Sequence, residues 1–466
     1  MTEIRFGTDG WRAIIAKDYT IENVERIAEG TAQWMLKRGM KNAVIGYDCR
    51  FGGVMFAETV ASVFGNYGIK TILSNSFVST PMVSLAVVKT HSDLGIVITA
   101  SHNPPMYNGY KLKSSYGGPT GPGDISEVES LIPATALSSF PSVKELENDG
   151  LLEYADLEKM YLDHVKENFD LDLIEKSGII LAYDGMYGAG QSAAKKIFKN
   201  AHFLHCDFNP SFEGVPPEPI LRNLSKLQSL IQHNPDINLG LANDGDADRI
   251  GLFDDQGNFI DSHHILLLLL HYFYSYKNLR GKVVVTFSVT DKMQKLARHF
   301  GLDVEVTKIG FKYIAEIMTK EDILVGGEES GGLAVKGHIP ERDGIWIGLV
   351  IMEFMAYTGK SLNVLIQDIY DLVGPFYCDR DDLHLTNDQK DDIIQKCQQG
   401  YFRKIGSRDI LRTDDLDGFK YYVSDDEFVM LRASGTEPVL RVYGQAPDLN
   451  SVRKLIDETK QMLLNS

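Results

Sequence analysis

The sequence has few cysteines and no long hydrophobic segment. Its four cysteines, Cys49, Cys206, Cys378 and Cys397, show no paired spacing. Scattered cysteines of this kind offer neither a disulfide framework nor a zinc site, and they are typical of a reducing compartment. The strongest apolar run, residues 265–270, is far shorter than the roughly 20 residues that a membrane-spanning helix needs. It therefore predicts a buried core helix.

A broad positively charged surface is also excluded. The chain has 64 acidic and 47 basic residues, which give a net charge of −17. Binding to nucleic acid or to an anionic membrane would require a broad basic face. Residues 1–6 lack the basic start and apolar core of a signal peptide. We expect a cytoplasmic protein that binds neither nucleic acid nor membrane, and nothing in the composition indicates an oligomeric state.

The chain does contain short apolar runs that alternate with helix-length segments. The runs cover residues 43–47, 94–99, 178–183, 239–242, 283–287 and 323–325. Uninterrupted runs are typical of strands that helices cover on both faces. Helical patterns are expected over residues 21–37 and 291–299. This alternation predicts repeated α/β/α layers.

Changes in composition suggest how the chain divides into domains, because 466 residues exceed what one core supports. Residues 117–142 are rich in Gly, Pro and Ser and predict a loop and linker. After residue 372, a polar helix over 386–398 and strands near 421–442 predict a separate α+β domain. We expect three α/β/α domains and one α+β domain, over residues 1–150, 151–256, 257–372 and 373–466.

The first polar loop follows the run that ends near Thr99 and contains Ser101. A serine at a strand end can be a nucleophile, a phosphate carrier, a metal ligand or a simple cap of a backbone amide. No Gly-x-Ser-x-Gly elbow surrounds it, which disfavours a hydrolase. The pair Asn108-Gly109 predicts a tight turn that returns Lys111 to the serine.

Lys111 has two interpretations. Near cations such as Arg12 and Arg249, its pKa would be lowered, and it would serve as a general acid and base. The alternative is an ordinary solvated lysine in a hairpin.

The second polar loop contains Asp244, Asp246 and Asp248 at every second position. Crowding raises the pKa values of such carboxylates unless a cation neutralises them. Their oxygen ligands suit Mg²⁺ first and Ca²⁺ second. The alternative is a solvated acidic turn. The neighbouring Arg249 would bind a phosphate oxygen.

Two further polar segments offer binding groups. Glu328 and Ser330 stand among glycines, where they would accept hydrogen bonds from sugar hydroxyls or form a flexible turn. Residues 432–438 and Arg441 combine two guanidiniums, two hydroxyls and glycine-permitted backbone amides. That combination favours a cradle for a phosphate dianion.

Together these segments resemble the α-D-phosphohexomutase superfamily over essentially the whole chain. Five motifs stand in the family's order, at residues 6–12, 99–104, 244–249, 327–331 and 432–438. The resemblance implies three related α/β/α domains and a C-terminal domain of the TATA-box-binding-protein-like fold. It also implies a Mg²⁺-dependent enzyme that interconverts hexose 1-phosphate and hexose 6-phosphate through a phosphoserine and a hexose 1,6-bisphosphate.

The resemblance also assigns roles to residues. It implies that Ser101 carries the phosphoryl group and that this phosphate binds Mg²⁺ together with Asp244, Asp246 and Asp248. Lys111 would be the general acid and base, with Arg12, His102 and Arg249 around the transferring phosphoryl. The residues implied to hold the substrate are Lys308, Glu328, Ser330, Arg342, Arg432, Ser434, Gly435, Thr436 and Arg441.

The identity of the hexose depends on the loop near Glu329. Enzymes that use both glucose and mannose usually have Met and His where this chain has Glu329 and Gly332. Phosphoglucosamine mutases usually have Gln at the position of Glu329. These departures favour glucose over mannose and glucosamine phosphates, which stay open.

Two further functions compete with a mutase. One is a phosphatase that releases the phosphoryl group of Ser101 to water. The second is a non-catalytic sugar-phosphate sensor that keeps the binding pocket. The complete set of Ser101, the three aspartates and Lys111 counts against the sensor.

Overall fold

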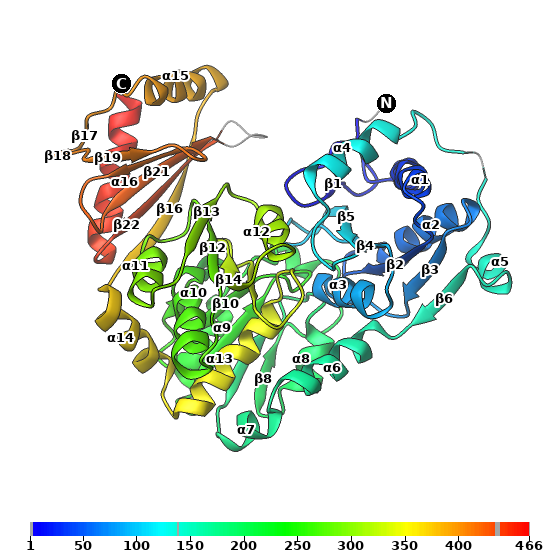
Figure 1. Ribbon diagram of the computed structural model, residues 1–466, viewed down its shortest axis with the longest axis horizontal. Coiled ribbons are helices and arrows are strands. Elements are labelled where there is room, and N and C mark those ends of the chain that lie inside the picture. Colours follow the sequence, from blue (N-terminus) through cyan, green and yellow to red (C-terminus); the bar gives the residue numbers. More distant parts are fainter. Residues whose placement is uncertain (1–2, 138, 434–438, 466) are drawn as a thin grey trace. The chain divides into compact units, whose positions relative to one another are not determined.

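The computed structural model describes residues 3–137, 139–433 and 439–465 (Figure 1). The chain divides into two compact units, Met1–Ser262 with Gly310–Asn363 and His263–Ile309 with Val364–Ser466. In the described ranges no single helix is long and apolar enough to cross a membrane; α13 (Gly344–Thr358) and α14 (Leu362–Val373) reach that length only when taken together.

The N-terminal sheet of the first unit is covered on both faces. Ile45 lies in one core with Val60 and Phe64, whereas a Cβ on Gly46 would meet Val83 at 2.4 Å on the other side. The apolar run at residues 43–47 therefore is a strand buried on both faces, as predicted. The sheet contains β1 (Trp11–Ile14), β2 (Asn42–Tyr47), β3 (Lys70–Ser74), β4 (Leu94–Ile98), β5 (Tyr107–Ser114) and β6 (Leu152–Ala155), in the order β1-β5-β4-β2-β3-β6. Its first helices are α1 (Ile21–Lys37), α2 (Gly53–Asn66) and α3 (Thr80–Lys89).

The predicted turn at Asn108-Gly109 is wrong, because β5 runs straight through both residues. The chain reverses earlier, between β4 and β5, and the two strands pair antiparallel with Val97 opposite Lys111. Gly109 is needed for a different reason. A Cβ there would meet the carbonyl oxygens of Thr99 at 2.5 Å and Trp11 at 2.6 Å. This glycine permits close approach of neighbouring backbone rather than a turn.

The segment 117–142 is not a continuous linker as predicted. It contains α4 (Pro122–Leu131), which begins with Pro122 at its first position and buries Val128. Proline at this position costs no hydrogen bond and already has a helical φ, so the Gly-Pro cluster marks a helix start. α4 packs against α1 (Figure 1). α5 (Val143–Asn148) follows it.

The first unit also contains a second sheet, in the order β11-β10-β9-β7-β8. β9 and β10 pair antiparallel, with Asn243 opposite Ile250, so that residues 244–249 form the hairpin loop between them. The strands are β7 (Leu181–Asp184), β8 (Ala201–Leu204), β9 (Leu239–Asn243), β10 (Ile250–Phe253) and β11 (Phe259–Ile260). The accompanying helices are α6 (Leu157–Asn168), α7 (Leu171–Lys176), α8 (Gln191–Ile197), α9 (Ser225–His233) and the short turns η1 (Phe212–Gly214) and η2 (Leu221–Asn223).

A second hairpin completes the first unit. β14 (Ile323–Gly327) pairs with β15 (Leu333–Val335), with Gly327 opposite Leu333, so residues 328–332 form its loop. α12 (Phe311–Met318) precedes this hairpin and α13 follows it. The bridge between Arg249 and Gly332 joins the two hairpin loops side by side.

The helix α10 (Ser262–His271) lies in the second unit from His263 onward, and its residues 265–270 are fully buried, as the apolar run predicts. The C-terminal part of the second unit is an antiparallel sheet in the order β16-β22-β21-β20-β19, with α16 packed on β22. This arrangement confirms the predicted change from α/β layers to α+β. The strands are β16 (Tyr377–His384), β19 (Arg412–Asp414), β20 (Phe419–Tyr422), β21 (Phe428–Ala433) and β22 (Val439–Ala446). The remaining elements are η3 (Tyr272–Tyr276), β12 (Lys282–Thr286), α11 (Lys292–His299), β13 (Val304–Thr307), α15 (Asn387–Gln398), β17 (Lys404–Ile405), β18 (Arg408–Asp409) and α16 (Leu449–Leu464).

Candidate active site

Ser101 lies three residues after β4, with a left-handed φ of 51° and only 1% of its surface exposed. Its Oγ donates a hydrogen bond to Asp244 Oδ2 at 2.8 Å and lies 3.3 Å from His102 Nδ1. The hydroxyl therefore bonds a carboxylate of a distant loop, not a backbone amide as a simple cap would. Ser101 and the aspartate loop, which the family resemblance assigns to one Mg²⁺ ion, are therefore in contact.

Arg50 holds the serine loop in place, and the sequence analysis missed it. Its guanidinium donates to the carbonyl oxygens of Ser101 and Asn103, both at 2.6 Å, and to those of Pro104 and Tyr107. Its Nε also lies 3.3 Å from Asp48 Oδ2, and both side chains are fully buried. Four hydrogen bonds from one planar group fix the reversal that presents Ser101. In the sequence, Arg50 is distinguished only by its position three residues after the buried strand β2.

Asp244, Asp246 and Asp248 come together as predicted. All three are fully buried, and each offers an oxygen within 4.8 Å of the others. Asp246 Oδ1 and Asp248 Oδ1 are buried and accept no hydrogen bond from any described residue. Buried carboxylate oxygens without donors are costly unless a cation coordinates them. The donor set is entirely oxygen, which fits a hard divalent ion.

The three carboxylates differ in their electrostatics. Burial and the repulsion of its two neighbours raise the pKa of Asp244 well above its ordinary value. Burial alone would also raise the pKa of Asp246, but the ammonium of Lys111 lowers it below the ordinary range. The crowding predicted from the spacing is therefore present, and Lys111 partly compensates it.

The surroundings of Lys111 differ from the prediction. Its Nζ lies 2.8 Å from Asp246 Oδ2, 2.8 Å from Asp9 Oδ2 and 3.2 Å from Asp248 Oδ2. Burial alone would lower the pKa of Lys111, but these three carboxylates raise it above its ordinary value. The prediction of a lowered pKa was wrong because carboxylates, not arginines, contact the ammonium.

Asp9 is a second residue that the sequence analysis did not single out. Besides Lys111, its Oδ2 contacts a guanidinium nitrogen of Arg342 at 2.5 Å. Burial alone would raise the pKa of Asp9, but Lys111 and Arg342 bring it well below its ordinary value. Its only signal was its place in the motif at residues 6–12.

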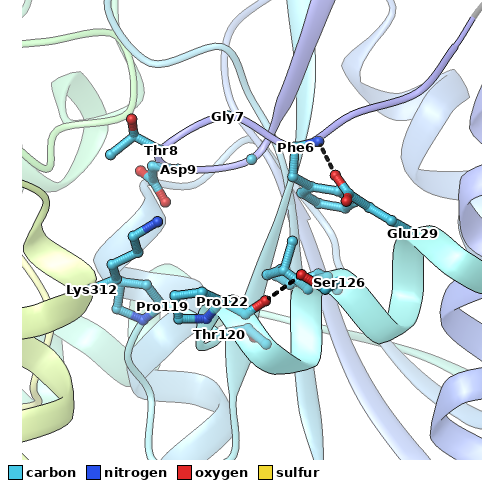
Figure 2. A pocket seen from close by; sticks show the side chains of 13 residues that line it. Phe6, Gly7, Thr8, Asp9, Pro119, Thr120, Pro122, Ser126, Glu129 and Lys312 are labelled. Atoms are coloured by element: carbon cyan, nitrogen blue, oxygen red, sulfur yellow. Dashed lines mark hydrogen bonds between the residues drawn. The ribbon is translucent and has the colours of Figure 1, made fainter. Parts of the chain in front are cut away.

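The loop that carries Asp9 is anchored on α4 (Figure 2). The backbone N–H of Phe6 donates to Glu129 Oε1 at 2.6 Å. Figure 2 shows Lys312 of α12 directed toward Asp9 across a cavity of about 160 Å³. The segment 117–142, predicted to be a linker, contains α4. Through Glu129 this helix supports the loop whose Asp9 contacts Lys111.

Arg12, His102 and Arg249 all lie around Ser101. Arg12 donates to Asn103 Oδ1 at 2.6 Å, and the backbone N–H of Arg249 donates to Asp244 Oδ1 at 3.0 Å. Burial and the guanidiniums of Arg249 and Arg12 lower the pKa of His102 well below its ordinary value. Its imidazole is therefore neutral near pH 7.

The loop at residues 328–332 adjoins the aspartate loop. Arg342 contacts Asp248 Oδ2 at 2.8 Å, and a Cβ on Gly332 would meet Arg342 Cδ at 2.4 Å. Burial raises the pKa of Glu328 to about 7. Ser330 is half-buried on the same loop. The structure thus brings Glu328, Ser330 and Arg342 to the same part of the first unit as Ser101.

The remaining predicted residues belong to the second unit. Lys308 follows β13. Arg432 of β21 stands directly opposite Arg441 of β22, and neither Nε donates to any described residue. Arg432 Nε lies 3.5 Å from Asp417 Oδ2, and Asp382 of β16 stands opposite Arg441, so acidic side chains already offset part of the repulsion between the two guanidiniums. Ser434, Gly435 and Thr436 lie outside the described residues.

Comparisons with known proteins match the whole arrangement. Models of the phosphoglucomutase/phosphomannomutase α/β/α domains I, II and III match residues 3–138, 159–257 and 261–373, and the model of the C-terminal domain matches residues 386–462. The boundaries predicted at residues 150, 256 and 372 stay predictions.

Relatives of similar length carry several names. A phosphoglucomutase/phosphomannomutase from Thermococcus kodakarensis is 28% identical over 97% of this chain and 96% of its own. A phosphoglucosamine mutase from Methanococcus maripaludis strain S2 is also 28% identical, with the same coverage. A crystal structure from Thermus thermophilus, described as a candidate phosphomannomutase, is 32% identical, covers 99% of both chains and has a TM-score of 0.87.

These matches extend over all four regions and agree with the motif order in the sequence. The chain therefore belongs to the phosphoglucomutase/phosphomannomutase family of the α-D-phosphohexomutase superfamily, and it is an enzyme, a mutase of the isomerase class.

Proposed function

We propose that the enzyme is a Mg²⁺-dependent phosphohexomutase that interconverts hexose 1-phosphate and hexose 6-phosphate, with Ser101 as the phosphoryl carrier. The contact between Ser101 Oγ and Asp244 Oδ2, 2.8 Å long and fully buried, carries this proposal. It joins a serine in a strained backbone conformation to an oxygen-only cation site. A hexose 1,6-bisphosphate is the proposed intermediate and activator.

The proposed chemistry consists of two phosphoryl transfers. A sugar hydroxyl attacks the phosphorus of phosphorylated Ser101, the bond from phosphorus to Oγ breaks, and the hydroxyl proton passes to Lys111. The bisphosphate then reorients, Ser101 Oγ attacks the phosphorus of its other phosphate, the bond from that phosphorus to the sugar oxygen breaks, and Lys111 returns the proton to that oxygen. A Mg²⁺ ion held by Asp244, Asp246 and Asp248 would neutralise charge on the phosphoryl oxygens and offset the carboxylates that raise the pKa of Lys111.

Cationic groups are assigned to the two phosphates. Arg12 and Arg249 approach the transferring phosphoryl, and neutral His102 is available as a hydrogen-bond partner of the serine oxygen. Arg432 and Arg441, with the neighbouring residues Ser434, Gly435 and Thr436, are proposed to hold the phosphate that does not react. The facing pair of guanidiniums supports this assignment, because a dianion would accept hydrogen bonds from both and add to the partial compensation that Asp417 supplies.

Glu328, Ser330 and Arg342 of the first unit are proposed to bind the sugar, and Lys308 of the second unit is assigned to the sugar by the family resemblance alone. Glucose phosphate is the first candidate because Glu329 and Gly332 differ from the residues usual for mannose and glucosamine enzymes. Glucosamine phosphate is supported equally by relatives named phosphoglucosamine mutase. A cytoplasmic location is part of the proposal because the four cysteines show no paired spacing in the sequence, and neither nucleic acid nor a membrane has a part in it.

A coupled assay with the 1-phosphates of glucose, mannose and glucosamine tests the substrate and the mechanism together. Wild-type enzyme with Mg²⁺ should convert one of them fastest, and Ser101→Ala should lose turnover on all three while keeping the thermal unfolding midpoint. Intact-mass spectrometry should show a phosphorylated fraction in wild type that Ser101→Ala lacks. Turnover by Ser101→Ala would reject the phosphoserine, release of inorganic phosphate alone would favour a phosphatase, and binding without turnover by wild type would favour a sensor.

A further inference from the structure

Thr80 connects the helix layer of the N-terminal sheet to the aspartate loop. It is the first residue of α3, directly after the N-cap residue Ser79, and it is fully buried. Asp246 stands 166 residues later in the chain, in the hairpin loop between β9 and β10. Both residues belong to the first unit.

Thr80 contacts Asp246 at two points. Its backbone N–H donates to the carbonyl oxygen of Asp246 at 3.0 Å, and its Oγ1 donates to Asp246 Oδ2 at 2.5 Å. Lys111 Nζ also donates to this Oδ2, at 2.8 Å. Asp246 Oδ1 accepts nothing from the described residues. The two donors thus fix the carboxylate so that Oδ1 is the oxygen left for a cation.

The hydroxyl of Thr80 is uncharged, unlike the side chains of Lys111 and Arg342. Lys111 and Arg342 donate to Asp246 and Asp248 with full positive charges, so they compete with a bound ion for the negative charge of the site. A hydroxyl orients the carboxylate without neutralising it. Its hydrogen bond to Oδ2 is compatible with a cation on Oδ1. Thr80 can therefore hold Asp246 both with and without a bound cation.

We propose that Thr80 is a positioning residue for the divalent cation. It holds Asp246 so that Oδ1 is directed into the aspartate cluster. This inference rests on the proposed cation site. It assigns a role in cation binding to α3, which lies outside all five sequence motifs. Hydrogen-bond partners of this kind typically contribute 10- to 100-fold to metal affinity.

The test measures Mg²⁺ affinity by isothermal titration calorimetry on the full chain. Thr80→Val removes the hydroxyl but keeps the backbone N–H and the branched shape, and should raise the Kd about 10- to 100-fold. Thr80→Ser keeps the hydroxyl and should stay within about threefold of wild type. Thr90→Val is the matched control, because Thr90 ends the same helix and its Oγ1 bonds Ala86 O and Ser92 Oγ, away from the aspartates.

Activity supplies a second measurement. With Thr80→Val, the Mg²⁺ concentration for half-maximal turnover should rise in parallel with the Kd, and saturating Mg²⁺ should restore kcat to near the wild-type value. A merely structural defect would lower kcat at every Mg²⁺ concentration. If Thr80→Val does not fold, Thr80→Ala carries the same expectation.

The outcomes separate this inference from the proposed function. Mg²⁺ binding by Thr80→Val within twofold of wild type, or equal weakening by Thr80→Ser, would overturn the role of Thr80 alone. Absence of Mg²⁺ binding by wild type, unchanged by Asp246→Asn, would overturn the cation site and the role of Thr80 with it.

Discussion

At the scale of single residues, the site depends on buried charged groups whose partners are supplied by distant parts of the chain. Arg50 bonds four carbonyl oxygens of the serine loop, Asp9 bonds Lys111 and Arg342, and Thr80 bonds Asp246. None of these partners is close in sequence to the residue that it contacts. Each contact is fixed only when the strands and helices have packed.

Replacement of Arg50 tests how the serine loop is held. An ammonium group cannot satisfy four carbonyl oxygens in the plane of a guanidinium, so Arg50→Lys should lower the free energy of unfolding by about 2–4 kcal/mol. It should also lower kcat, because Ser101 is no longer held in place. Urea denaturation measures the first effect. Arg38→Lys, in a partly exposed pair with Glu127 and Asp124, should change stability by less than about 1 kcal/mol, and an equal loss in both variants would contradict the argument.

Glu328 should make stability depend on pH. Its pKa of about 7 in the folded protein exceeds the value of about 4.3 expected in the unfolded chain. The folded state therefore binds this proton more tightly, so the resulting stabilisation is complete below about pH 4 and is lost as the pH rises through about 7. Between about pH 5 and pH 8, wild type should lose up to about 3 kcal/mol more than Glu328→Gln. Urea denaturation of the metal-free proteins measures this difference, and parallel pH profiles would argue against it.

At the scale of elements, the sequence predicts the strands better than the loops between them. The buried strands at residues 43–47 and 239–242 are uniformly apolar, because helices cover both faces, and this pattern is local. The helix α4 was missed because its Gly-Pro start also signals a loop, and it is identified by its packing on α1. The turn at Asn108-Gly109 was mispredicted because a glycine needed for close backbone approach is indistinguishable in sequence from a turn glycine.

Gly109 provides a test of this close approach in β5. A Cβ at Gly109 would lie 2.5 Å and 2.6 Å from two backbone oxygens that cannot move independently of their strands. Gly109→Ala should therefore destabilise the protein by at least about 2 kcal/mol. Gly123→Ala is the control, because Gly123 lies in α4 with no atom within 4 Å of the new Cβ and should be neutral or stabilising by up to about 1 kcal/mol. Thermal unfolding measures the stability of both variants, and equal changes in Tm would contradict the close backbone approach at Gly109.

At the scale of the whole molecule, the family and the fold class were within reach of the sequence, whereas the environment of Lys111 was not. Five motifs in order identify the superfamily, but they do not specify that carboxylates, rather than arginines, contact Lys111. That geometry depends on where the loops of two sheets and the segment after β15 meet. The sequence therefore predicted that Ser101 and the three aspartates lie together, but not the contacts of Arg50 and Asp9 or the raised pKa of Lys111.

Divalent cations should stabilise the folded chain as a whole. The unpartnered oxygens of Asp246 and Asp248 are available only in the folded state, so Mg²⁺ at about 100 times its Kd should add about 2.7 kcal/mol to the free energy of unfolding. Scanning calorimetry should show a higher Tm with Mg²⁺ and its reversal by a chelator. Asp246→Asn should abolish most of this response. An unchanged Tm in wild type would mean that the aspartates bind no divalent ion.

The charges around the aspartates favour an ion of higher valence. Lys111 and Arg342 lie 2.8 Å from Asp246 and Asp248, respectively, and Arg249 Nε lies 4.0 Å from Asp248 Oδ1. Despite these cations, burial and the repulsion of its two neighbours raise the pKa of Asp244. A divalent ion would offset this repulsion more fully than Na⁺ or K⁺, because it carries twice the charge. Selection of the ion by valence would then follow from the repulsion among the aspartates, before the size or coordination geometry of the ion plays any part.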